Sequence, residues 1–93
     1  MGSRPVDRTD GRDQATTIRR LTGDGARWRV RVESWRVGDE FQGRIVFEPD
    51  GPASRTEPRV GPARLRGRSR EDLLSSAYDL SEQWLRELLH ALG

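Results

Sequence analysis

Residues 27–48, RWRVRVESWRVGDEFQGRIVFE, decide the fold of this chain. Apolar and charged side chains alternate on both sides of Gly38-Asp39, and such alternation is typical of strands with one buried and one solvated face. Gly38-Asp39 suits a two-residue hairpin turn. The stretch therefore predicts two antiparallel strands joined at this turn.

The register of this hairpin follows from the position of its turn. A loop at Gly38-Asp39 places apolar residues opposite apolar residues on one face and opposite charges across from each other on the other face. The predicted pairs are Val32 with Ile45, Val30 with Phe47, Glu33 with Arg44, and Arg29 with Glu48. Both kinds of complementarity favour the same register, because a slip by one residue would reverse the faces.

Downstream of the hairpin, residues 49–62 contain four prolines and two glycines, which predicts a long connection. Alternation resumes incompletely through Val60, Ala63 and Leu65. Because Pro62 cannot donate to a ladder, we expect a third strand at the edge of the sheet.

A single long helix is predicted from Ser69 to the end of the chain. Ser69 suits an N-cap, two acidic residues follow in the first turn, and apolar residues recur with helical spacing as far as Leu92. Such a helix has about six turns. Its apolar residues form two neighbouring stripes, which together are wider than one contact surface requires.

These elements predict the α+β class: a three-stranded antiparallel sheet in the order β-β-β-α, with one long C-terminal helix packed on one face. Residues 26–93 form this single domain. Residues 1–25 hold only five apolar side chains and are expected to be a flexible polar tail. A helical turn or a short added strand over residues 13–21 is the alternative, which Ile18 and Leu21 alone do not decide. The predicted core joins the sheet to the first helical stripe; it consists of Val30, Val32, Ile45, Phe47 and Leu65 against Leu73, Ala77, Leu80, Trp84 and Leu88.

The second helical stripe predicts a homodimer, because one sheet face is too small to cover both stripes. Its candidate interface residues are Tyr78, Ser81, Leu85, Leu89 and Leu92. Ser81 lies at the centre of the apolar arc, where a small side chain permits a close approach of helices. The alternative is that a strongly coiled sheet, or Ile18 and Leu21, covers the same stripe within one chain.

Composition argues against an enzyme. The chain has no cysteine, no lysine and one histidine, His90, so thiol, Schiff-base and histidine-pair chemistry have no residues to carry them. We therefore expect no catalytic residues, no metal and no cofactor. With a mean hydropathy of −0.87 and no long apolar run, we expect no membrane span and a cytoplasmic location.

All 17 basic residues are arginine, and several of them surround an aromatic residue on the solvent side of the predicted sheet. The candidate nucleic-acid contacts are Arg29, Arg31, Trp35, Arg44, Arg64 and Arg66. The competing interpretation is an ion-paired, solvated face, because Glu33 and Glu48 lie opposite two of these arginines and would neutralise them.

FEPD at 47–50, closing the second predicted strand, and GRSREDLLSSA at 67–77, opening the helix, resemble the corresponding parts of HicB-type antitoxin domains. The resemblance covers roughly residues 27–92. It implies a bacterial protein with a partial ribonuclease-H-like fold, no nuclease activity, and a small RNA-cleaving toxin as partner. Together with the composition, it favours a non-catalytic protein-interaction module with an unidentified protein partner; the alternative is a nucleic-acid-binding protein.

Overall fold

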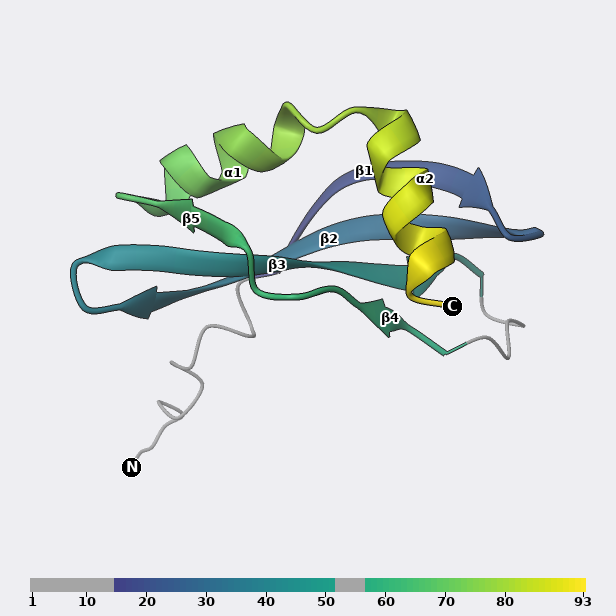
Figure 1. Ribbon diagram of the computed structural model, residues 1–93, viewed down its shortest axis with the longest axis horizontal. Coiled ribbons are helices and arrows are strands. Elements are labelled where there is room, and N and C mark those ends of the chain that lie inside the picture. Colours follow the sequence, from purple (N-terminus) through teal and green to yellow (C-terminus); the bar gives the residue numbers. More distant parts are fainter. Residues whose placement is uncertain (1–14, 52–56) are drawn as a thin grey trace.

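The computed structural model describes residues 15–51 and 57–93, which form five strands followed by two helices (Figure 1). The strands are β1 (Thr16–Gly23), β2 (Ala26–Val37), β3 (Glu40–Pro49), β4 (Arg59–Val60) and β5 (Leu65–Gly67). The helices are α1 (Arg70–Tyr78) and α2 (Glu82–Ala91).

The β2–β3 hairpin has the predicted turn and the predicted register. All four predicted pairs occur, Val32 with Ile45, Val30 with Phe47, Glu33 with Arg44, and Arg29 with Glu48. Gly38 adopts a φ of 62°, a left-handed conformation that glycine reaches without the steric cost of a Cβ atom. This hairpin forms the centre of the sheet.

Strand β1 corrects the prediction of a tail over residues 1–25. Thr16–Gly23 pairs antiparallel with β2, and Leu21, opposite Trp28, is only 5% exposed. A tight Asp24-Gly25 turn joins the two strands, with φ values of 50° and 76°. The domain therefore begins before residue 26, and the tail prediction for residues 1–14 lies outside the described residues.

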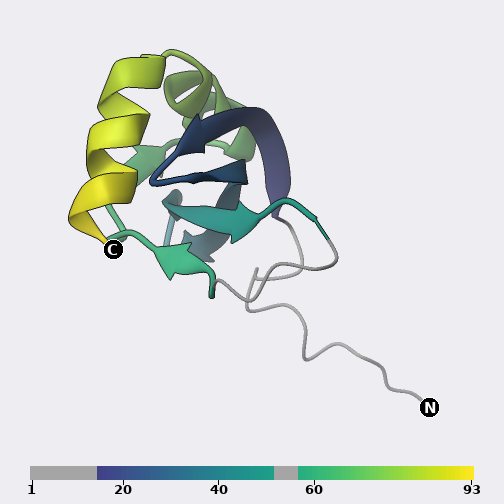
Figure 2. The same ribbon diagram turned by 90° about the vertical axis from the view of Figure 1, so that its right-hand side faces the viewer.

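The sheet is antiparallel, with the order β1-β2-β3-β4, and β5 pairs with a different part of β3. Both helices lie on the same side of this sheet (Figures 1 and 2). The α+β class and the antiparallel sheet are confirmed. Three strands were too few, because β1 lies in the predicted tail and the predicted third strand, through Val60 and Leu65, is divided into β4 and β5.

The prediction of one long helix is wrong, because the chain leaves the helical conformation between Tyr78 and Glu82. Ser81 has extended φ and ψ angles, and its hydroxyl oxygen accepts a hydrogen bond from the Trp84 N–H at 3.0 Å. Ser81 therefore acts as the N-cap of a second helix. The break lets α1 and α2 cross the sheet in different directions (Figure 1).

The break also changes which side of α2 faces the sheet. Leu85 and Leu89 are fully buried, whereas Trp84 is 45% exposed and Leu88 is half-buried. The predicted core is confirmed at Val30, Val32, Ile45, Phe47, Leu73 and Ala77, which are all buried. Leu65 and Leu80 pack at the margin of the core, and Trp84 does not belong to it.

Candidate functional site

The predicted dimer interface is not a free surface. Leu85 and Leu89 lie in the core between α2 and the sheet, Leu92 packs partly against the core, and Ser81 caps α2. Tyr78, at the end of α1, projects outward with 52% of its surface exposed, and Ser81 is the other exposed member of the set. This correction follows from the helix break, which turns the second predicted stripe toward the sheet.

The predicted nucleic-acid residues separate into two places. Arg29, Arg31 and Trp35 of β2 and Arg44 of β3 lie on the sheet face opposite the helices, because they alternate with core residues. Arg66 of β5, opposite Gln42, lies on that same face. We call this surface, with its four arginines and Trp35, the arginine face.

Most charges of the arginine face are already paired. The carboxylate of Glu48 forms ion pairs with Arg29 Nη2 at 3.3 Å and with Arg31 Nη1 at 2.9 Å. Arg44 Nε pairs with Glu33 Oε1 at 2.8 Å. The Arg44 guanidinium also lies 5.6 Å from the centre of the Trp35 ring. The strand register predicts the pairs of Arg29 and Arg44, whereas Arg31, opposite Val46, reaches Glu48 diagonally. All three pairs leave less positive charge for a phosphate backbone.

Arg64 lies apart from the arginine face, at the margin of a small groove. The groove has a volume of about 100 Å³ and lies between α2 and the chain that links β4 to β5. Its lining is apolar except for one guanidinium; the lining residues are Ile45, Pro62, Arg64, Leu65, Trp84 and Leu88. We call it the Trp84 groove.

The strand side of the Trp84 groove arises where the chain leaves the sheet. After β4, the Gly61 N–H donates to the Ile45 carbonyl oxygen at 2.8 Å, and the Arg64 N–H then donates to the Pro62 carbonyl oxygen at 2.9 Å. This turn interrupts the pairing along β3 until Leu65 resumes it opposite Gly43. Ile45 therefore has no continuous strand beside it and contributes to the groove.

The helix side of the Trp84 groove is fixed by the start of α2. The Ser81 hydroxyl oxygen accepts a hydrogen bond from the Trp84 N–H, and the burial of Leu85 and Leu89 sets the rotation of the helix about its axis. Trp84 and Leu88 are one turn apart and line the groove together. The groove was not predicted from the sequence, because Trp84 and Leu88 were both assigned to the core. Apolar residues continue with helical spacing across the break at Ser81, so this spacing does not reveal the rotation of α2.

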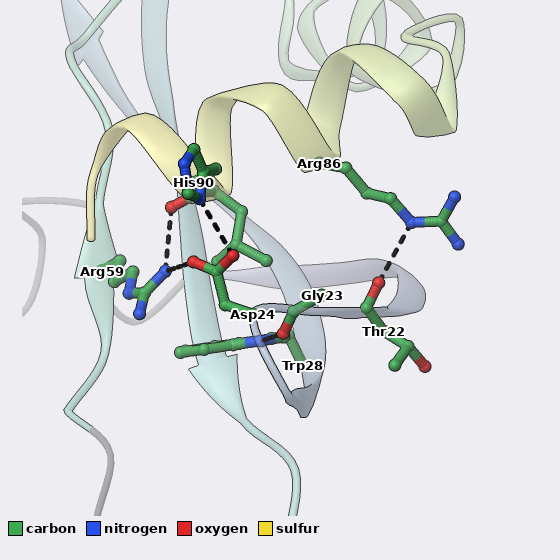
Figure 3. A network of polar contacts seen from close by, with 8 residues as sticks. Thr22, Gly23, Asp24, Trp28, Arg59, Arg86 and His90 are labelled. Carbon is green, nitrogen blue, oxygen red and sulfur yellow. Dashed lines mark hydrogen bonds and ion pairs between the residues drawn. The ribbon is translucent and has the colours of Figure 1, made fainter.

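A polar network at the other end of α2 connects three elements (Figure 3). Asp24, in the β1–β2 turn, accepts from Arg59 Nη1 at 2.7 Å and lies 3.0 Å from His90 Nδ1. The same Arg59 nitrogen donates to the Leu89 carbonyl oxygen at 2.9 Å, and the guanidinium lies 4.7 Å from the centre of the Trp28 ring. The hydrogen bond from Arg59, and then that from His90, hold the pKa of Asp24 below its usual value of 3.8.

This network joins α2, β4 and the β1–β2 turn, and we interpret it as structural. Arg59 is held by an acid, a carbonyl and an aromatic ring, so its charge is satisfied within the chain. Nearby, Trp28 Nε1 donates to the Gly23 carbonyl oxygen and Arg86 Nε donates to the Thr22 carbonyl oxygen, at 2.9 and 3.0 Å. These contacts fix one end of α2 and thereby the position of its other residues.

Within residues 15–51 and 57–93, no group of three or more histidine or acidic side chains is arranged to hold a metal ion. Neither described helix is long and apolar enough to cross a membrane. Comparison with protein families, curated proteins and solved structures finds no match to this chain. The resemblance to HicB-type antitoxin domains therefore stays a prediction.

Proposed function

We propose that this chain is a non-catalytic protein-interaction module and that its partner binds at the Trp84 groove. The observation that carries the proposal is a half-exposed tryptophan beside an apolar depression. Aromatic anchors and the pockets beside them contribute much of the binding energy in protein interfaces. Trp84 has this character, because it keeps 45% of its surface exposed while Leu85, next to it in the sequence, is fully buried.

The rigid setting of the groove supports the same proposal. Its helix wall is held at one end by the Ser81 cap and at the other by the network around Asp24. A preorganised apolar surface loses little conformational entropy when a partner binds. The resemblance to HicB-type antitoxins adds one partner class to examine, a small RNA-cleaving toxin.

The proposal is tested by comparing proteins retained from host extract by the wild type and by Trp84→Glu. Tyr78→Glu is the matched control, because Tyr78 is exposed to a similar extent as Trp84 but lies on α1, away from the groove. We expect a partner that the wild type and the control retain and that Trp84→Glu loses, with circular dichroism unchanged among the three. If both variants retain the same proteins as the wild type, the groove is not the binding site.

The second candidate function is nucleic-acid binding by the arginine face. Arg66 favours it, because none of the described residues forms an ion pair with this arginine, and Trp35 offers a ring for stacking. Duplex and single-stranded RNA and DNA would be titrated at two salt concentrations. Binding should weaken with salt by a log–log slope of about 0.9 per phosphate contact on duplex DNA, and Arg66→Ala should reduce that slope. Absence of binding at low salt would eliminate this candidate.

A further inference from the structure

We infer that the Trp84 groove accepts a bulky aliphatic side chain from an acidic peptide segment of a partner protein. The inference rests on the proposed function and adds the chemistry of the partner. It follows from three properties of the site: the size of the depression, its apolar lining, and the charges that lie along one side of it.

The size and the lining define the anchor residue. The depression measures about 100 Å³, and five of its six lining residues are apolar. A cavity of about 150 Å³ accommodates a benzene molecule, so a space of this size suits one aliphatic side chain. A polar anchor would lose its hydrogen bonds to water against Ile45, Leu65 and Leu88 without finding replacements.

The charges define what flanks the anchor. Arg64 lines the groove and is exposed, whereas Arg66 lies on the arginine face and Arg68 is not among the lining residues. Arg64 forms no ion pair with any described residue, whereas Arg29, Arg31, Arg44 and Arg59 each contact an acid.

The guanidinium of Arg64, unpaired among the described residues, therefore places positive charge on the strand side of the groove. On α2, Glu82 pairs with Arg86 and Glu87 accepts a hydrogen bond from Gln83, and neither acid lines the groove. A peptide with an acidic residue next to its anchor would therefore meet Arg64 and not glutamate. Charge on an edge strand also prevents sheets from pairing, and the experiment below separates that role from binding.

The test selects peptides from a random phage-displayed library on the immobilised wild-type chain. We expect enriched sequences with one Leu, Ile or Met flanked by Asp or Glu. Labelled synthetic copies would then be titrated by fluorescence anisotropy against the wild type, Trp84→Glu, Arg64→Glu and Arg27→Glu. Arg27 is the matched control, because it is exposed and has no ion-pair partner among the described residues but lies on β2, away from the groove.

Arg64→Glu should weaken binding about tenfold, and replacing the peptide's acids with lysine should restore binding to this variant. Arg27→Glu should bind like the wild type. Enriched peptides that need Trp84 but carry no acids would overturn this inference and leave the proposed function standing. If no enriched peptide depends on Trp84, or if an oligonucleotide displaces the peptides and binds through Arg64, both fail.

Discussion

At the scale of the residue, the neighbours Trp84 and Leu85 have opposite environments. Leu85 is fully buried against the sheet, and Trp84 is 45% exposed at the groove. Their difference is set by the direction in which α2 presents each side chain, since both residues are apolar. Stability and the proposed binding therefore depend on different residues of the same helical turn.

Leu85→Ala should destabilise the domain by about 2–5 kcal/mol, the usual cost of truncating a buried leucine. Its side chain is fully buried between α2 and the sheet. The free energy of unfolding is measured by urea denaturation, with Tyr78→Ala as the control that should change it by less than about 0.5 kcal/mol. Equal effects of the two substitutions would contradict the burial of Leu85.

Asp24 gives the domain an acid-dependent component of stability. Its pKa is lowered in the folded state by Arg59 and then by His90, so the unfolded state binds a proton more readily. This contribution is present above the usual carboxyl pKa of 3.8 and is lost as the pH falls through the lower, folded-state value.

Asp24→Asn should remove that acid-dependent component. Asparagine tolerates the φ of 50° at this position, so the turn is retained while the charge is lost. In thermal unfolding at pH 7 the variant should melt below the wild type, and the gap should narrow as the pH is lowered below 3.8. A gap that stays constant down to pH 2 would show that the carboxylate charge does not contribute.

At the scale of the element, the hairpin was predictable to the residue, and β1 was not. The hairpin has alternation on both strands and a Gly-Asp turn, so each signal supports the other. In β1 only Ile18 and Leu21 are apolar, and a register shift between Thr17 and Arg19 breaks the alternation. The Asp24-Gly25 dipeptide was the one local signal of a second hairpin.

The helix break and the groove were also hidden from the sequence, for a related reason. Ser81 fits a helix interior as well as an N-cap, and apolar residues continue with helical spacing on both sides of it. The groove needs this break, because it depends on the rotation of α2. The groove also depends on the turn between Gly61 and Arg64, where the segment that follows β4 stops pairing with β3. The hydrophobic pattern of the sequence gives no signal of this turn.

A chain shortened to residues 26–93 tests β1 as an element. Without β1, the edge of β2 loses its partner strand and the core loses Leu21, so we expect an unfolded circular dichroism spectrum. A chain of residues 15–93 should give the folded spectrum of the full chain. A folded spectrum from residues 26–93 would mean that β1 is dispensable, as the tail prediction required.

At the scale of the whole molecule, the apolar surface that motivated a homodimer is largely covered within one chain. Leu85 and Leu89 pack on the sheet, Leu21 of β1 joins the same core, and Ile18 packs at its margin. This is the intramolecular alternative that the sequence analysis left open. Among the described residues, the large apolar side chains that stay exposed are Val37, Val60, Tyr78 and Trp84, and only Trp84 of these lines the groove.

Sedimentation equilibrium at tens of micromolar therefore distinguishes two possible partners of the groove: a segment of another protein and a second copy of this chain. If the groove binds an acidic segment of another protein, the molecular mass should stay near 10.6 kDa as the protein concentration rises. Trp84→Glu should leave that mass unchanged. A mass near twice this value that returns to 10.6 kDa in Trp84→Glu would instead identify the second copy as the partner, and the charge of the occupant would then have to come from the chain's own acidic residues.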